Sequence, residues 1–174
     1  KTDLALRTLR AQKPAVDALE ENDFSLYVSI PFCPTRCSYC SFVSQSVEQA
    51  KKLVDPYFDL LLLELEKTAA VTKALGLTLC TVYIGGGTPT TLSASQLEAL
   101  CGKIGEQFDF SRCTEFTVEA GRPDTITREK LAALKRSGVS RISINPQSLS
   151  DQVLQNIGRK HTAQDVLDAF GLAR

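Results

Sequence analysis

The alternation of short strand-like runs with longer helical ones limits this chain to few folds. β-Branched, aromatic and other apolar residues gather at 24–30, 78–84, 113–120 and 139–145, as they do in strands. Apolar residues with helical spacing occupy segments 47–75, 93–108, 127–138, 150–157 and 162–172. Strands that alternate with helices pair in parallel through right-handed crossovers. The sequence therefore predicts an α/β fold with outer helices, in which the apolar run 78–84 is a strand buried on both faces.

A complete eightfold (β/α) barrel needs roughly 250 residues, whereas this chain has 174. We therefore expect an incomplete barrel with four βα units. Residues 4–19 have a helical periodicity that Pro14 interrupts, so residues 1–23 are predicted to be a lead-in helix and residues 24–174 the N-terminal part of the barrel. The chain starts at Lys1 and contains no Met, so we expect a fragment. With only four βα units, we expect its C-terminal part to be missing.

Neither the net charge nor the hydropathy indicates that the protein binds nucleic acid or a membrane. The 20 basic residues balance the 20 acidic ones, so the net charge does not indicate nucleic acid or an anionic membrane. The apolar run 60–63 is soon followed by charged residues, and no run reaches the roughly 20 apolar residues that span a bilayer. No secretory signal is present. We predict a cytoplasmic protein.

Three of the six cysteines lie close together after the first predicted strand. Cys33, Cys37 and Cys40 have the spacing C-x3-C-x2-C, which is typical of metal binding in a reducing compartment. Three thiolates can hold an iron–sulfur cluster and leave one iron open to a ligand. The alternatives are an incomplete zinc site, which would need a nearby fourth ligand, or buried cysteines that only pack. Core packing is the role predicted for the other three, Cys80, Cys101 and Cys113.

Glycines and polar residues follow the other predicted strands, at the edge where α/β folds place active sites. Residues 85–89 (GGGTP) could let a ligand approach the backbone, although a glycine turn is often only structural. Glu119 ends the third strand and could accept hydrogen bonds from a ligand, or be an ordinary surface carboxylate. Gln147 follows the fourth strand, and its position favours a functional role.

Three cationic or titratable residues are weaker candidates. Arg122 could pair with a substrate carboxylate through its planar fork, or be a solvated loop residue. Arg159 could bind an anion, although arginines between helices are often surface cations. His161 is more often a structural or capping residue than an acid–base group at such a position.

The cysteine spacing, with an aromatic residue before the last cysteine, resembles the signature of radical S-adenosylmethionine (radical SAM) enzymes. This resemblance implies a 4Fe–4S cluster on Cys33, Cys37 and Cys40 whose open iron is chelated by SAM. It also implies that an electron from the cluster breaks SAM into methionine and a 5′-deoxyadenosyl radical, which abstracts hydrogen from a substrate. Residues 85–89 resemble the GGGTP segment that these proteins place against the SAM amino group.

Five motifs occur in the order found in oxygen-independent coproporphyrinogen III oxidases, most like the HemZ branch: residues 27–33, 85–89, 119–123, 143–147 and 158–162. The resemblance implies an oxidoreductase of heme biosynthesis that decarboxylates two propionates of coproporphyrinogen III to vinyl groups, with an external electron donor. It also implies one or two bound SAM molecules. The SAM contacts of the family fall on Tyr27, Tyr39, Gly86, Gly87, Thr88, Glu119, Gln147 and Arg159.

Two alternatives stay open. Well-studied oxidases have a further cysteine shortly after the third ligand, whereas this chain continues from Cys40 with Ser41 and Phe42, as HemW-type heme chaperones do. The sequence at 121–124 (GRPD) is closer to that of the oxidases. The second alternative is an iron–sulfur module without enzymatic activity, which the open iron site and the GGGTP segment disfavour.

Overall fold

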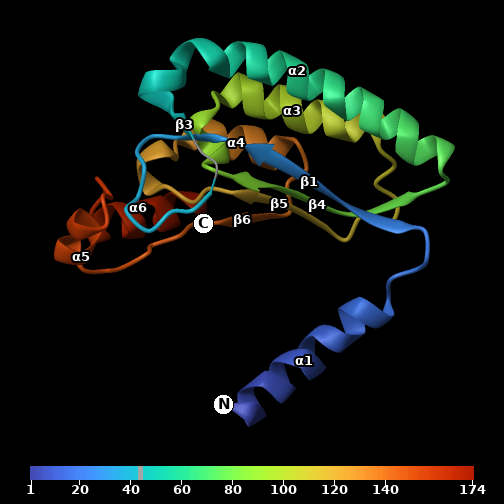
Figure 1. Cartoon of the computed structure of the whole chain (residues 1–174), viewed down its shortest axis with the longest axis horizontal. Coiled ribbons are helices and arrows are strands. Elements are labelled where there is room, and N and C mark those ends of the chain that lie inside the picture. Colours follow the sequence, from blue (N-terminus) through green and yellow to red (C-terminus); the bar gives the residue numbers. More distant parts are fainter. Residues whose placement is uncertain (43–44) are drawn as a thin grey trace.

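A computed structural model describes residues 1–42 and 45–174 and contains one central parallel sheet. The strand order is β1-β4-β5-β6, with parallel pairing between all neighbours. The strands are β1 (Asp23–Ile30), β4 (Thr78–Gly86), β5 (Glu115–Glu119) and β6 (Arg141–Ser143). β1 and β6 are the two edges, so the sheet is open (Figure 1). The predicted α/β class, parallel sheet and incomplete barrel are confirmed.

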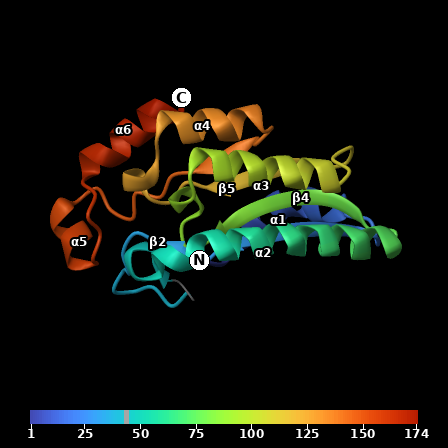
Figure 2. The same cartoon turned by 90° about the horizontal axis from the view of Figure 1, so that it is seen from above.

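The three crossover helices lie on one face of the sheet (Figure 1). They are α2 (Val47–Ala74), α3 (Ala94–Gln107) and α4 (Arg128–Arg136), and Figure 2 shows them side by side. Two further helices, α5 (Asp151–Asn156) and α6 (Ala163–Ala173), follow β6. Because all four strands are parallel, the segments after their carboxyl ends meet at one edge of the sheet.

Local sequence signals explain where these helices begin and end. Ser93 and Thr162 form capping boxes with Gln96 and Asp165, so each pair satisfies backbone groups at the start of a helix. Gly76 follows α2 with a φ of 66°, a left-handed conformation that glycine adopts at low cost.

The core lies between the sheet and the crossover helices. Its fully buried members are aliphatic, and they include Ile30, Ile84, Leu97, Leu100, Ile104, Val118 and Leu134. On the opposite face of β4, Thr81 and Tyr83 are only partly buried. The prediction that this strand is buried on both faces is therefore wrong, because the crossover helices cover only one of them.

Several details differ from the sequence prediction. α1 (Thr2–Asp17) continues through Pro14, since a proline in the last turn removes only one backbone donor, and it buries none of its residues. The fourth strand is shorter than residues 139–145. A small parallel sheet of β2 (Phe32–Cys33) and β3 (Gln45–Ser46) was not predicted. The division at residue 23 stays a prediction. Within residues 1–42 and 45–174, each helix is too short or too polar to cross a membrane.

Candidate iron–sulfur and SAM site

The three clustered cysteines lie in the loop that follows β1. Cys33 ends β2, and Cys40 N donates to Cys37 O at 3.1 Å, which closes a tight turn. Cys37 is buried, whereas Cys33 and Cys40 are partly exposed, and all three are free thiols. They line one cavity at the carboxyl edge of the sheet. The loop therefore brings all three cysteines to the same cavity.

Two hydrogen bonds hold this cysteine loop against the segment between α5 and α6. Ser38 N donates to Ile157 O at 3.1 Å, and Thr35 Oγ1 donates to Gly158 O at 3.3 Å. Gly158 has a φ of 77°, and a Cβ atom there would lie 3.3 Å from Arg36 O. Glycine at 158 thus permits both the turn and the close approach of the loop.

The glycines after β4 lie directly against the cysteine loop. Gly87 N donates to Ile30 O at 2.8 Å. A Cβ atom on Gly87 would lie 2.8 Å from Phe32 O and 3.0 Å from Cys33 Sγ. Thr88 is buried, and its hydroxyl lies 3.3 Å from Cys33 Sγ. Gly86, Gly87 and Thr88 all line the cavity, and Gly87 and Thr88 lie against the first cysteine. Their contact with a ligand stays a prediction.

Glu119, at the end of β5, is oriented by a tyrosine that the sequence analysis missed. Tyr83 Oη donates to Glu119 Oε1 at 2.5 Å. Burial and this carboxylate raise the pKa of Tyr83 to about 12. Tyr27 pairs with Tyr83 in the sheet register, and their rings stack with centroids 5.9 Å apart. Tyr27 and Tyr83 each alternate with buried residues along their strands, and this pattern could have indicated that both lie on the same face of the sheet.

The structure brings most of the predicted SAM contacts together, but not all. Glu119, Gln147 and Arg159 line the cavity with Tyr39. Tyr27 lies outside it, exposed on the open face of the sheet. Gln147 has a φ of 60°, an uncommon conformation for a residue with a side chain. Such strain often occurs at functional sites.

Arg159 extends from the α5–α6 segment into the cavity. Its Nη1 donates to Gly121 O at 3.3 Å, and its Nη2 donates to Tyr39 Oη at 3.1 Å. Its Nε is buried and has no hydrogen-bond partner among the described residues. A buried donor without a partner is costly, and an anionic ligand in the cavity would satisfy it.

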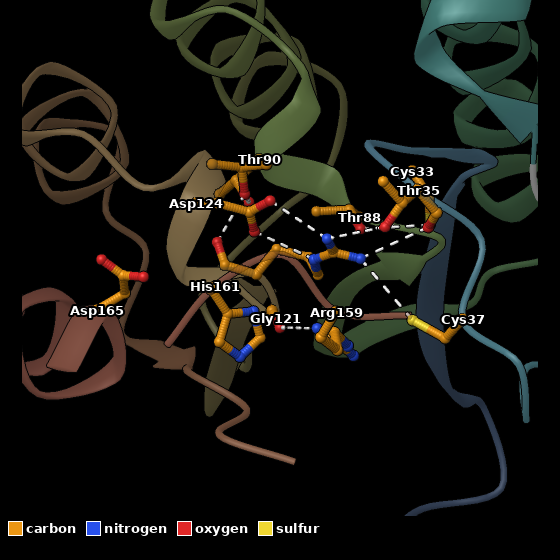
Figure 3. A network of polar contacts seen from close by, with 12 residues as sticks. Cys33, Thr35, Cys37, Thr88, Thr90, Gly121, Asp124, Arg159, His161 and Asp165 are labelled. Atoms are coloured by element: carbon orange, nitrogen blue, oxygen red, sulfur yellow. Dashed lines mark hydrogen bonds and ion pairs between the residues drawn. The ribbon is translucent and has the colours of Figure 1, made fainter. Parts of the chain in front are cut away.

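Arg122 has neither of the roles first considered for it, whereas His161 fits the structural role that the sequence favoured. Arg122 lines the cavity but is 3% exposed, and its guanidinium donates to Thr35, Cys37 and Asp124 rather than extending toward a substrate. Figure 3 labels these three partners. His161 is also buried, does not line the cavity, and approaches Pro146 O at 3.5 Å. Burial lowers the pKa of His161. The structural interpretation of His161 is therefore favoured.

The donor set fits an iron–sulfur cluster better than a single metal ion. In the described parts of the chain, no three His, Cys, Asp or Glu side chains converge as ligands of one ion. In a cluster each thiolate binds a different iron atom, so the sulfurs need not converge on one point. Three free thiols around one cavity, with glycines packed against the first of them, meet that requirement.

Comparison with known proteins agrees with this arrangement. Residues 27–174 match the profile of the radical SAM superfamily. The oxygen-independent coproporphyrinogen-III oxidase-like protein HemZ of Bacillus subtilis is 40% identical over 155 residues, which are 88% of this chain and 31% of HemZ. The heme chaperone HemW of the same bacterium is 41% identical over 151 residues, which are 86% of this chain and 38% of HemW.

A solved structure of the radical SAM enzyme HemN, the coproporphyrinogen III oxidase of Escherichia coli, superposes with a TM-score of 0.78 at 30% identity. The superposition covers 95% of this chain and 37% of HemN. The chain thus spans about a third of the length of these relatives. Its fold, its sequence and the matched profile show that it belongs to the radical SAM superfamily, in the group that contains HemN, HemW and HemZ.

Proposed function

We propose that this chain binds a 4Fe–4S cluster through Cys33, Cys37 and Cys40, with SAM beside it, as part of a coproporphyrinogen III dehydrogenase. The reaction is the oxidative decarboxylation of propionate side chains to vinyl groups in heme biosynthesis. An external donor supplies the electron. One observation carries the proposal: the three thiols share a cavity with most of the candidate SAM contacts.

When bound, the cluster and SAM supply a reductive cleavage that yields a radical able to take hydrogen from a substrate. The residues of this chain bind and orient the two groups. Gly87 keeps space beside Cys33 that a side chain would fill, and Gly86 does the same beside Ser29 and Ile30. Glu119, oriented by Tyr83, accepts hydrogen bonds from the ammonium or ribose of SAM. Arg159 offers its buried Nε to an anionic group.

A heme chaperone is the second candidate. The names of the relatives are divided between oxidase-like proteins and heme chaperones, at 40% and 41% identity. The sequence that follows Cys40 has no further cysteine nearby, which is the feature that favours a chaperone of the HemW type. The GRPD sequence at 121–124 favours the dehydrogenase.

Anaerobic reconstitution of the purified protein with iron and sulfide tests the proposal. We expect a 4Fe–4S electron paramagnetic resonance signal after reduction that changes when SAM is added and is lost in Cys37→Ala. The matched control is Cys101→Ala, because Cys101 is buried in α3, away from the cavity. An absent signal, or one that ignores SAM, would refute the radical SAM proposal.

Turnover and heme binding then separate the two candidates. The dehydrogenase converts coproporphyrinogen III to vinyl products with consumption of SAM. The chaperone binds heme in a fixed ratio and forms no vinyl product. Stoichiometric heme binding without decarboxylation would refute the first candidate and support the second.

A further inference from the structure

Arg122 is a buried cation in direct contact with a proposed cluster ligand. Its side chain is 3% exposed, and its Nη1 lies 3.8 Å from Cys37 Sγ, within hydrogen-bond range for sulfur. Nη2 donates to Thr35 Oγ1 at 3.1 Å, and Nε donates to Asp124 Oδ1 at 3.1 Å. Each nitrogen of the guanidinium therefore has a partner, and two of the partners belong to the cysteine loop.

From this geometry we propose that Arg122 is a positioning residue that orients the Cys37 sulfur and makes the cluster easier to reduce. The inference rests on the proposed cluster site and adds a residue that influences the reduction potential of the cluster. Reduction of the cluster adds one negative charge. A nearby cation that donates a hydrogen bond to a ligand sulfur stabilises the reduced state more than the oxidised state. Arg122 thus raises the reduction potential.

Asp124 reduces the effect of Arg122 on the reduction potential. Its carboxylate takes two hydrogen bonds from Arg122, at 3.1 and 3.2 Å, and its side chain is 28% exposed. The carboxylate offsets part of the charge of the guanidinium and fixes its plane. The two residues therefore act on the cluster in opposite directions, since removal of Asp124 leaves the cation of Arg122 less compensated.

The same arginine also fixes the position of the loop. Thr35 accepts a hydrogen bond from Arg122 and donates one to Gly158 O at 3.3 Å. The loop is thereby connected to the segments after β5 and after α5. A role in binding a substrate carboxylate is disfavoured, because the guanidinium is buried and its donors are already occupied.

Reduction potentials of the reconstituted protein, measured by spectroscopic redox titration, separate this electrostatic role from a structural one. In Arg122→Gln we expect the reduced-to-oxidised ratio at a fixed potential to fall on the order of tenfold, which is about 59 mV for a one-electron couple. In Asp124→Asn we expect the potential to move the opposite way. Arg122→Lys should recover part of the loss, because it keeps the charge but not the planar fork.

The control for charge is Arg128→Gln, which removes one exposed cation on α4 that has no contact with the cysteine loop. Its potential should stay that of the wild type. Thr35→Val tests the loop alone, because it removes the hydroxyl but leaves the Arg122 donor to Cys37. Trypsin cleavage after the exposed Arg36 in the cluster-free protein should be faster in Arg122→Gln and in Thr35→Val.

The outcomes distinguish this inference from the proposed function. If the wild type binds a cluster but Arg122→Gln and Asp124→Asn both keep its potential, or both shift it in the same direction, the electrostatic role of Arg122 is refuted. If Arg122→Gln assembles no cluster, Asp124→Asn alone tests the electrostatic role. A rise in its reduction potential supports that role, and a fall or no change refutes it. If the wild type binds no cluster, the proposed function and this redox role both fail, while the proteolysis rates still report on the loop.

Discussion

Gly87→Ala tests whether the close packing of the glycine segment on the cysteine loop is essential. The new Cβ atom would lie 2.8 Å from Phe32 O, 3.0 Å from Cys33 Sγ and 3.0 Å from Ile30 O. Two of these three atoms belong to the backbone of the β1–β2 segment, which cannot move aside as the end of a flexible side chain can. Overpacking of this kind costs about 1–3 kcal/mol.

The same substitution at Gly102 is the matched control. Gly102 lies inside α3, and a Cβ atom there would have nothing within 4 Å. Alanine is a better helix former than glycine, so Gly102→Ala should stabilise the fold by about 0.5–1 kcal/mol. The two variants should therefore differ by about 1.5–4 kcal/mol in the free energy of unfolding.

Urea unfolding of the cluster-free protein under reducing conditions, followed by circular dichroism, measures this difference. Iron content after reconstitution measures the effect on the site, and we expect Gly87→Ala to retain less iron than Gly102→Ala because the new methyl group displaces Cys33 Sγ. Equal unfolding free energies and equal iron content in the two variants would refute the argument that contact with the loop requires glycine at position 87.

The remaining predictions concern three other parts of the fold. Tyr83 has a pKa raised from 10.0 to about 12, so its neutral phenol stabilises the fold below pH 10, and this stability is lost as the pH rises toward 12. Tyr83→Phe should therefore weaken the fall in unfolding free energy over that pH range, and should also weaken SAM binding, because Glu119 loses its hydrogen bond. Leu154→Ala should cost about 2–5 kcal/mol in urea unfolding and lower the iron content, since Leu154 is the one fully buried side chain of α5 among the described residues. Arg136→Ala should change stability by no more than about 0.5 kcal/mol, because its ion pair with Glu98 is exposed.

Each of these predictions has an outcome that contradicts it. A pH profile of Tyr83→Phe identical to that of the wild type would mean that the phenol of Tyr83 does not couple to the fold. Full iron content in a destabilised Leu154→Ala variant would show that α5 does not support the loop. A large loss of stability in Arg136→Ala would show that the pair with Glu98 is not screened by solvent as expected.

The fold was predictable because the sequence pattern and the local signals agree. Ser93 and Thr127 each precede a helix that the periodicity also indicates, and each side chain accepts a hydrogen bond from the backbone three residues on. The position of the site followed from topology alone, because parallel strands deliver Cys33, Gly87 and Glu119 to the same edge. These features depend on short-range patterns and on the parallel direction of the strands.

The sequence predictions were wrong or incomplete where a side chain's contacts depend on packing between segments that are distant in the sequence. The pattern of β5 and its following loop could not indicate that Arg122 turns back toward a cysteine 85 residues earlier in the chain. Tyr83 lies within an apolar run that predicted a strand buried on both faces, and that interpretation concealed its polar contact with Glu119. Both contacts depend on which neighbouring strand or loop comes close, and a single sequence does not specify this.

The cysteine loop is therefore supported by segments that come later in the chain. Its only regular structure among the described residues is the two-residue pairing of β2 with β3. Its other contacts include Gly87 and Thr88 after β4, Arg122 after β5, and Gly158 and Arg159 after α5. Each of these segments follows β4, β5 or α5, so it lies beside the loop when the fold is assembled. We infer that the sheet must be assembled before Cys33, Cys37 and Cys40 hold their mutual arrangement, so a cluster would bind to the folded site rather than organise an unfolded one.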